Sequence, residues 1–545
     1  MIKQIIYPNV FISFFVLLIL TISVDVLSAQ NSGFVSNLPI ILIDTEGKNI
    51  PDEPKITARM KIIDNADQPN KITDQANGYD GFIGIELRGA SSQSYPQKPF
   101  AIETRDAGGN NLTTSLLGLP AENDWVLLSN YNDKSFMRNI LGYKMFEALG
   151  NYAPRARYAE VFLNGDYQGI YLFGEKVKRD KNRVDIANLK EEDIEGEELT
   201  GGYIFKIDYW NDWDSWESPF SPINHPDFDI HFIYHDPDWD ELLPQQKNYL
   251  SSFVTDFETV LYSSSYNNPA EGYSQFIDVE SFIDYFIVNE MSRNNDGFKK
   301  SRYFHKDKNG KIKAGPVWDF DWAWKNINEC YIFKATDGSG WSYKVNDCNP
   351  WVKSPGWMVR LFYDENFRNQ TKCRYNKARA GVLSNENLSF WIDSLYNEVA
   401  EAQVRHFGKW KILGVNVGAP EVDAQPKTYI GEVEKLRQWI TTRLNWLDKN
   451  MIGNCINTSN FVEFENNNEV RIYPNPVSEI LNVTAESELE EISIISVTGT
   501  RIYSNNSINE RDTKIDVSGF APGMYIVQIK NADGSTLAQK VIIQK

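Results

Sequence analysis

Two acidic segments near the middle of the chain carry residue types that could do chemistry. Asn294-Asn295-Asp296-Gly297 follows a helical pattern over residues 279–292, and Trp318-Asp319-Phe320-Asp321-Trp322 belongs to a strand-like run that begins at Gly315. The 23-residue step from Asp296 to Asp319 leaves room for one β-hairpin. We therefore predict that the chain returns these aspartates to one place, at the end of a helix and the end of a strand.

Paired acidic groups flanked by Asn serve two kinds of reaction. In metal-assisted phosphoryl transfer, one Asp accepts the proton of the attacking hydroxyl and a second holds Mg²⁺ against the nucleotide phosphates. In glycoside hydrolysis, two carboxylates act on the sugar bond directly. The spacing alone leaves both reactions open, together with a structural role as turn caps and strand-end charges.

The elements that would position these segments are readable from periodicity and turn residues. Alternating runs at 83–87 and 100–104 predict one hairpin, and runs at 160–163 and 170–173 around Asn164-Gly165 predict another. Amphipathic patterns predict helices at 135–149, where Ser135 is the expected N-cap and Gly150 the stop, and at 246–262, 279–292 and 432–451. Short β-rich runs after residue 471, including 480–484 and 492–497, predict an all-β sandwich.

Composition excludes several classes of protein. With 55 Lys+Arg against 74 Asp+Glu, the net charge of −19 argues against a nucleic-acid binder, and 42% hydrophobic residues exclude a disordered scaffold. An apolar run over 10–24 before Leu27-Ser28-Ala29 predicts a cleaved signal peptide at 1–29. No comparable apolar stretch follows, so we expect no integral membrane span after cleavage.

The four cysteines agree with an exported protein. They are Cys330, Cys348, Cys373 and Cys455, and four cysteines permit three pairings. Proximity favours Cys330–Cys348, which would leave Cys373–Cys455.

The C-terminal 75 residues resemble the type A sorting domain of the type IX secretion system. The resemblance is carried by Tyr473-Pro474-Asn475-Pro476, Leu481-Asn482-Val483, Asp516-Val517-Ser518 and Gly523-Met524-Tyr525. It implies that residues 471–545 address the chain to the type IX secretion machinery. The protein would then be exported through the periplasm and be secreted or attached to the outer surface.

The large region before it resembles the CotH kinase family, related to spore-coat protein H. The motifs run in order over nearly 300 residues: Leu87 to Ser92 with Pro96-Gln97-Lys98, Asn123 to Leu128, Lys134 to Asn139, Tyr158 to Gly165, Glu175 to Asp180, Asn294 to Asp296, and Gly315 to Asp321. The resemblance implies an α+β fold, an atypical two-lobed protein-kinase-like domain over 30–455, joined by a linker at 456–470 to the small β-sandwich at 471–545.

The family also implies roles for individual residues. Asp296 takes the catalytic position and Asp319 the metal position, with ATP and Mg²⁺ or Mn²⁺ as cofactors. The nucleotide-binding candidates are Gly89, Ser91 and Ser92 in a phosphate-covering turn, Lys98 as the phosphate-pairing lysine or a surface charge, and Arg138 as a cleft-facing cation or a surface ion-pair partner. The implied activity is transfer of a phosphoryl group to Ser or Thr of an unknown surface or secreted protein.

One departure from the kinase pattern bears on activity. The pattern places a metal-binding Asn shortly after the catalytic Asp, but Lys299-Lys300-Ser301-Arg302 occupies that stretch. Ser301 or Asp321 would have to serve as the second metal ligand. Because ATP is also scarce outside the cell, the alternative is a catalytically inactive kinase fold that acts as a binding or structural module. A polysaccharide-acting enzyme that uses the same carboxylates is a third hypothesis.

Overall fold

The computed structural model describes residues 33–66, 68–455, 470–496, 501–506, 508, 510–531 and 536–544. The chain divides into two compact units, Met1–Cys455 and Ile456–Lys545, and each is described by itself. The predicted signal peptide at 1–29 lies outside the described residues, as does the predicted linker apart from residue 470.

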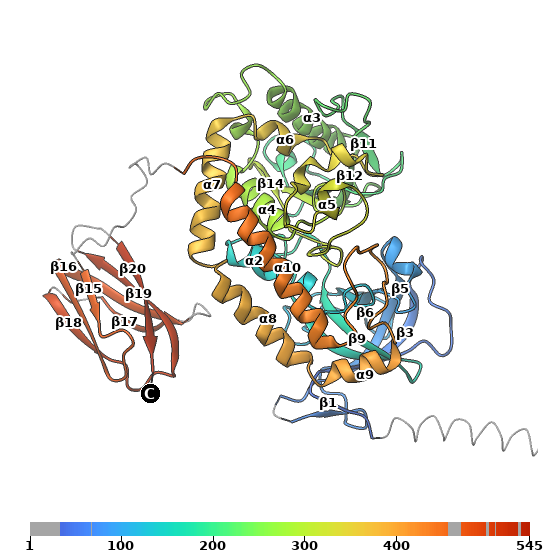
Figure 1. The fold of residues 1–545 in the computed structure, drawn as a ribbon, viewed down its shortest axis with the longest axis horizontal. Coiled ribbons are helices and arrows are strands. Elements are labelled where there is room, and N and C mark those ends of the chain that lie inside the picture. The colour runs from blue at the N-terminus through green and yellow to red at the C-terminus, as the bar shows by residue number, and fades with distance from the viewer. Residues whose placement is uncertain are drawn as a thin grey trace, which may run out of the picture. The chain divides into compact units, whose positions relative to one another are not determined.

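A closed β-barrel forms the first part of the larger unit (Figure 1). Its core is filled by aliphatic and aromatic side chains that alternate with outward-facing ones, as in β6, where every second residue is buried. The barrel strands, in their order around the barrel, are β2 (Ile40–Asp44), β3 (Ile56–Ile63), β5 (Tyr79–Leu87), β6 (Phe100–Arg105), β7 (Asp124–Ser129), β9 (Asp166–Glu175) and β8 (Ala156–Leu163). Beside the barrel, β1 (Val35–Ser36) pairs with β4 (Asn70–Lys71).

Both predicted hairpins are confirmed within this barrel. β5 pairs with β6 in antiparallel register, and the 3-10 turn η1 (Ser91–Ser94) lies in their connection. β8 pairs with β9, and Leu163 lies opposite Asp166. Asn164 and Gly165 form the two-residue turn at φ values of 49° and 80°, a conformation that Asn and Gly tolerate best.

The second part of this unit is a sheet with helices packed against it. The sheet order is β11 (Ser215–Glu217), β12 (His231–Asp236), β10 (Tyr203–Ile207), β13 (Arg302–Lys306) and β14 (Ile312–Ala314). The helices are α2 (Arg138–Ala148), α3 (Pro244–Leu261), α4 (Val279–Met291), α5 (Tyr331–Lys334), α6 (Trp357–Leu361), α7 (Glu365–Ala380), α8 (Asn385–Val399), α9 (Ala402–Lys409) and α10 (Tyr429–Asn450), with 3-10 turns η2 (Glu198–Thr200), η3 (Tyr273–Gln275) and η4 (Ser342–Cys348).

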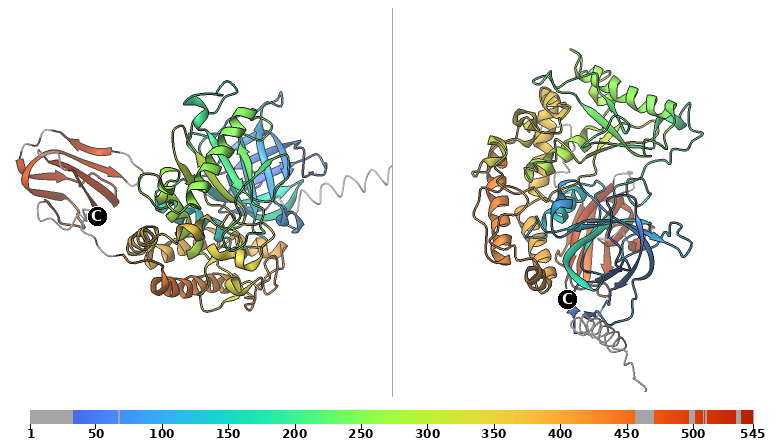
Figure 2. Two further views of the ribbon diagram at one scale, coloured as in Figure 1. Left: turned by 90° about the horizontal axis from the view of Figure 1, so that it is seen from above. Right: turned by 90° about the vertical axis from the view of Figure 1, so that its right-hand side faces the viewer.

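Late helices tie the two parts together. Figure 2 shows α7, α8 and α10 as a layer that runs along one side of both the barrel and the sheet. α9 packs on barrel strand β9, where His406 Nδ1 accepts a hydrogen bond from the Ile170 amide at 3.1 Å and the Trp410 indole donates to the Gln168 carbonyl at 2.9 Å. The barrel is therefore held from a segment more than 200 residues away.

The structure confirms the predicted helices, corrects the start of one of them, and overturns one predicted strand. α2 begins at Arg138 rather than Ser135, because the Asp133 carboxylate, not Ser135, accepts the Arg138 amide. The predicted strand at 315–320 is wrong: strand β14 ends at Ala314, and the following segment is irregular.

The C-terminal unit is all-β, as predicted, but its strand division differs. The two runs at 480–484 and 492–497 belong to one long strand, β16 (Ile480–Ser496), because its first half pairs with β15 and β18 and its second half with β17 and β19. A single apolar core lies beneath them. The other strands are β15 (Val470–Tyr473), β17 (Arg501–Asn505), β18 (Glu510–Asp516), β19 (Gly523–Asn531) and β20 (Thr536–Ile543).

The described cysteines pair as proximity favours. Cys330 is bonded to Cys348, and Cys373 in α7 is bonded to Cys455 at the end of the larger unit. Within the described ranges, none of the helices combines the length and apolar character that crossing a bilayer requires.

One buried carboxylate predicts how stability depends on pH. Glu258 in α3 accepts hydrogen bonds from the Ser218 hydroxyl at 2.6 Å and the Trp357 indole at 2.8 Å, and burial raises its pKa from 4.5 to about 7. Between these values the folded state holds a proton that the unfolded chain releases. The free energy of unfolding should therefore fall as pH rises from about 4.5 to about 7.

Glu258→Gln keeps the shape of the side chain and removes its titration. We expect the variant to lose this pH slope, by at most about 3 kcal/mol across the window, in urea unfolding followed at several pH values. An unchanged slope in the variant would show that Glu258 is not the titrating group.

Candidate functional site around Asp296 and Asp319

The two acidic segments meet where α4 and the β13–β14 hairpin end. The Asn294 side chain, just after α4, donates a hydrogen bond to the Asp319 carbonyl at 3.1 Å. The charge of Asp296 acts on the carboxylates of both Asp319 and Asp321. The hairpin between the segments therefore returns them to one place, as the spacing predicted. We call Asp296, Asp319 and Asp321 the acidic cluster.

Asp296 lies in a tight turn and is paired with lysines. Its carbonyl accepts the amides of Lys299 and Lys300, at 2.9 and 3.0 Å, which folds the turn back on itself. Lys299 Nζ lies 3.3 Å from one carboxylate oxygen and Lys300 Nζ 3.7 Å from the other. Lys299 also lies 3.6 Å from Glu329, whose carboxylate accepts the Asn295 amide group at 2.5 Å.

Asp319 faces Ser301 across the site. The Ser301 hydroxyl donates to Asp319 Oδ2 at 2.7 Å. Removal from water raises the pKa of Asp319 to about 7, the charge of Asp321 adds to the increase, and the Ser301 hydrogen bond and the charge of Arg88 oppose it. Together, burial and a neighbouring carboxylate favour the protonated form unless a cation is present.

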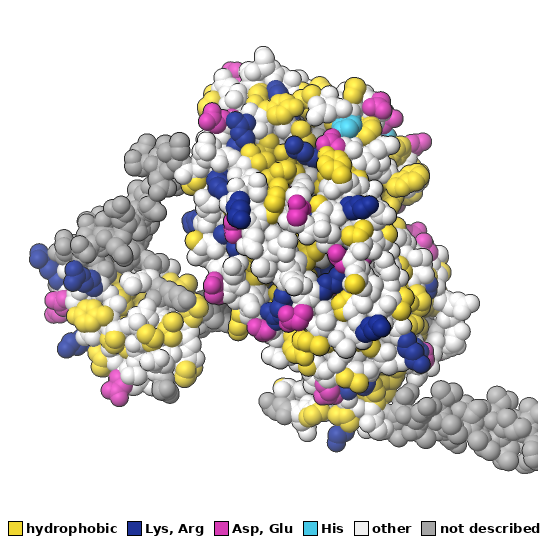
Figure 3. Space-filling model, viewed as in Figure 1, with side chains coloured by type: hydrophobic (Ala, Val, Ile, Leu, Met, Phe, Trp, Pro, Cys, Tyr) yellow, Lys and Arg dark blue, Asp and Glu magenta, His cyan; other side chains and the backbone are white. Residues whose placement is uncertain are grey.

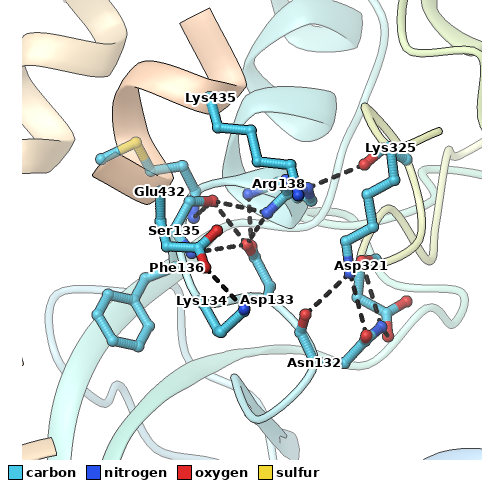
Figure 4. A network of polar contacts seen from close by, with 12 residues as sticks. Asn132, Asp133, Lys134, Ser135, Phe136, Arg138, Asp321, Lys325, Glu432 and Lys435 are labelled. Atoms are coloured by element: carbon cyan, nitrogen blue, oxygen red, sulfur yellow. Dashed lines mark hydrogen bonds and ion pairs between the residues drawn. The ribbon is translucent and has the colours of Figure 1, made fainter. Parts of the chain in front are cut away.

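Asp321 is held by the loop that precedes α2. Asn132 Nδ2 donates to Asp321 Oδ2 at 2.9 Å, and Lys325 Nζ donates to the carbonyl and side-chain oxygens of Asn132 at 2.9 and 3.0 Å (Figure 4). Burial raises the pKa of Asp321 as well, while Asn132 and Lys325 oppose the increase. Asp321 is thus hydrogen-bonded directly to a neutral amide, that of Asn132. Lys325 contacts Asn132 and acts on Asp321 only through its charge.

Lys325 is itself anchored from the last helix. It lies 3.8 Å from Glu421, which in turn lies 2.5 Å from Lys435 on α10. Burial lowers the pKa of Lys325 to about 8. Although burial works against ionisation of Glu421 too, Lys325 and Lys435 hold its pKa down to about 2. The carboxylate of Asp321 is therefore positioned through contacts that reach α10.

The backbone around Asp319 is unusual. Asp319 and Ser301 have φ values of 54° and 51°, a left-handed conformation that is unfavourable for residues with a side chain. Between the two aspartates, the Phe320 amide donates to Asn139 at 2.8 Å, and its ring packs on Gly142 of α2. A Cβ at Gly142 would lie 2.5 Å from that ring. Close approach of α2 therefore fixes the residue between Asp319 and Asp321.

The predicted phosphate-covering turn lies beside the cluster. Gly89 has a φ of 83°, and Ser91 is exposed while Ser92 is partly buried. Just after the turn, Tyr95 lies within the electrostatic field of Asp321 and Asp296, and burial raises its pKa to about 12. The turn and the acidic cluster therefore border the same region.

Lys98 and Arg138 occupy different surroundings from each other. Lys98 Nζ donates to the Gln93 carbonyl at 2.6 Å, so the lysine is hydrogen-bonded to the backbone of the turn. Arg138 is buried: its guanidinium pairs with Asp133 at 2.5 Å and donates to the Ala323 carbonyl at 2.9 Å (Figure 4). It therefore faces the protein interior and supports the segment that follows Asp321.

Sequence reasoning gave no role to three neighbours of the cluster: Arg88, Asn132 and Lys325. A usable signal exists for one of them. Lys325 follows the aromatic run Trp322-Ala323-Trp324, and a lysine within a run of buried residues calls for a carboxylate or carbonyl partner. The roles of Arg88 and Asn132 can be recognised only in the folded structure, where the barrel and the loop before α2 pack against the Asp319 segment.

A surface cavity of about 220 Å³ lies away from the acidic cluster. Its lining includes His225, Asp347, Arg360 and Tyr363, and none of the residues expected at the site. Figure 3 shows hydrophobic side chains gathered over the part of the larger unit where Figure 1 places α6. The cavity therefore says nothing of the chemistry of the acidic cluster.

Gly142→Ala tests the contact that fixes Phe320. The added methyl group would force Phe320 and the flanking carboxylates to move, and we expect the free energy of unfolding to fall by about 1–3 kcal/mol in urea titration. Gly408→Ala in α9 is the matched control, because a Cβ there meets nothing within 4 Å; it should leave stability unchanged or slightly higher. Equal effects of both substitutions would contradict the packing argument.

Comparisons with known proteins add the family. The model of the family described as CotH kinase protein matches residues 85–447, well over half of the chain, and that of the secretion system C-terminal sorting domain matches residues 471–544. The first match covers the turn at Gly89 and the whole acidic cluster. The second spans the all-β unit and marks the protein as secreted or placed on the outer surface.

Two individual proteins share short stretches with this chain. Beta-agarase D of Zobellia galactanivorans is 32% identical over 77 residues, which are 14% of this chain and 15% of the agarase. CopC from Methylosinus trichosporium OB3b matches 14% of this chain and 90% of its own length at 17% identity, with a TM-score of 0.11 that carries no argument. The extent of the first family match is decisive: the chain belongs to the CotH kinase protein family and ends in a secretion system C-terminal sorting domain.

Proposed function

We propose that this protein is a secreted or surface-attached atypical kinase that transfers the γ-phosphoryl group of ATP to a Ser or Thr hydroxyl of another surface protein. One observation carries the proposal: the acidic cluster and Ser301 lie together beside the turn at Gly89, Ser91 and Ser92, here called the glycine-serine turn. Kinases need this set: a proton acceptor, metal ligands and backbone amides near the phosphates.

The residues fit a divalent cation that arrives with a nucleotide. Asp319 and Asp321 have raised pKa values, and among the described residues neither has a direct cationic partner. Mg²⁺ or Mn²⁺ would stabilise such a pair of carboxylates. The buried Tyr143 hydroxyl, within the field of Asp319, has no hydrogen-bond partner among the described residues. No three His, Cys, Asp or Glu gather as a complete site in the described ranges. A nucleotide-bound metal needs only one or two carboxylates, because phosphates and waters complete its shell.

In this mechanism Asp296 accepts the proton of the attacking hydroxyl. That oxygen forms a bond to the γ-phosphorus while the bond from phosphorus to the bridging oxygen breaks, and ADP leaves with the electron pair. The metal, when bound, supplies positive charge for the phosphate oxygens. Asp319 and Asp321 would hold it, and the Ser301 hydroxyl could serve as an additional, neutral ligand. Lys299 and Lys300 lie where they can offset negative charge close to Asp296.

The wider fold supports the same proposal. In a kinase-like arrangement, the barrel would be one lobe and the sheet with its helices the other. The nucleotide would then lie between the Gly89 turn and the acidic cluster. The type IX secretion machinery would recognise the sorting domain in the periplasm and export the chain from there. Both proposals place the enzyme where surface proteins are its available acceptors.

Asp296→Asn and Asp319→Asn test the two roles separately. We expect either change to lower phosphoryl transfer to a mixed surface-protein acceptor, or autophosphorylation, by at least about a thousandfold. Asp319→Asn should also abolish Mn²⁺-dependent nucleotide binding, whereas Asp296→Asn should retain it. Circular dichroism checks that both variants fold. Wild-type rates in either variant would contradict the assignment.

A second candidate function is a non-catalytic binding module. The observation in its favour is that both carboxylate oxygens of Asp296 are already engaged by lysines. Nucleotide-dependent phosphorylation by the wild-type protein, lost in Asp296→Asn, would exclude this candidate.

The disulfides predict a separation of activity from stability. Glu329 stands next to Cys330 and contacts Asn295 and Lys299 on either side of Asp296, so Cys330→Ser with Cys348→Ser should loosen the surroundings of the proposed base. We expect a loss of activity of about tenfold, and of about 3 kcal/mol in the free energy of unfolding.

The matched control is Cys373→Ser with Cys455→Ser, which opens a bond across a sequence separation of 82 rather than 18. We expect it to lower the free energy of unfolding by about 4–5 kcal/mol and to leave activity of the folded protein unchanged. The reverse order of effects on activity would contradict the contact chain through Glu329.

A further inference from the structure

Arg88 lies where the barrel meets the acidic cluster. It follows β5 directly and precedes Gly89, and its amide donates to the Pro99 carbonyl at 3.2 Å. The side chain is partly buried, and its guanidinium carbon lies 5.4 Å from the centre of the Trp318 ring. Trp318 immediately precedes Asp319. The guanidinium therefore lies close to the residue that precedes Asp319, while its backbone leads directly into the turn at Gly89.

The charge of Arg88 acts on groups of the site, but no carboxylate among the described residues pairs with it. Its charge reaches Asp319 and the hydroxyls of Tyr143 and Tyr303. Among the described residues, no carboxylate or carbonyl pairs with the guanidinium, which lies over the Trp318 ring. A partly buried arginine whose donors are unused is suited to an anion that arrives from outside.

Other cations near the turn lack this freedom. Lys98 is hydrogen-bonded to the Gln93 carbonyl, and Arg138 is buried against Asp133. Lys299 and Lys300 pair with Asp296, on the side where the acceptor hydroxyl would lie. Arg88 alone of these combines unused donors with a place next to both Gly89 and Asp319.

We propose that Arg88 is the residue that binds the phosphate chain of the nucleotide. Its planar guanidinium presents paired N–H donors that match two phosphate oxygens. The Trp318 ring lies beside it, with its centre 5.4 Å from the guanidinium carbon. The assignment rests on the proposed nucleotide-dependent function. It replaces the lysine expected from the kinase pattern with an arginine that precedes the turn instead of following it.

The test is binding of ATP and of adenosine to the full chain in Mg²⁺, by calorimetry, for the wild type and for Arg88→Gln. We expect Arg88→Gln to weaken ATP binding by at least about tenfold and to leave adenosine binding unchanged, because only ATP carries phosphates. Arg88→Lys should fall between the two, since it keeps the charge but not the paired donors.

Arg59→Gln is the matched control. Arg59 also stacks on an aromatic ring of the barrel, 4.8 Å from the centre of Phe82, but it is exposed and already paired with Asp80 at 3.0 Å. It should bind ATP as the wild type does. Thermal unfolding of each variant separates loss of binding from loss of folding.

The outcomes distinguish this assignment from the proposed function. If the wild type binds ATP and a folded Arg88→Gln binds it equally well, Arg88 is not the phosphate ligand, although the kinase proposal stands. If Lys98→Gln loses ATP binding and Arg88→Gln does not, the lysine holds that role. A wild-type protein that binds no nucleotide with Mg²⁺ or Mn²⁺ overturns both proposals.

Discussion

Two partly buried carboxylates on one short irregular segment, neither with a direct cationic partner among the described residues, are the constraint on which the site depends. Burial raises the pKa of both Asp319 and Asp321, and the charge of Asp321 raises that of Asp319 further. The direct hydrogen bonds to them come from neutral groups, the Ser301 hydroxyl and the Asn132 amide. Such a pair is unfavourable when ionised. Contacts from the surrounding elements hold the pair in place, and either protonation or a bound cation relieves the repulsion.

The surroundings do fix it, through elements far apart in the chain. Phe320 between the carboxylates packs on Gly142 of α2, Asn132 comes from the loop before α2, and Lys325 is anchored through Glu421 to Lys435 on α10. Buried side chains that are fully hydrogen-bonded can hold such strain, which is common at functional sites. The barrel adds the Gly89 turn and Arg88, whose guanidinium lies over the Trp318 ring. Both parts of the larger unit are therefore needed to build one site.

Much of the fold and part of the site were predictable from the sequence. The hairpin around Asn164-Gly165 and helix α4 follow from local rules, and the spacing of Asp296 and Asp319 predicted that they meet. Local rules failed where tertiary contacts decide. Residues 315–320 look like a strand, but Phe320 is drawn onto α2, and Asp319 takes a left-handed conformation. Arg88 and Asn132 had no signal, because their meaning comes from surfaces that pack only in the folded chain.

The most direct measurement is a crystal structure of the larger unit with Mn²⁺ and a non-hydrolysable ATP analogue, with anomalous diffraction to locate the metal. The account predicts an Mn²⁺ peak about 2.1 Å from an oxygen of Asp319, with the phosphates between that ion and the Gly89 turn. A metal bound elsewhere, or a nucleotide that leaves the acidic cluster untouched, would contradict the claim that this cluster is a phosphoryl-transfer site.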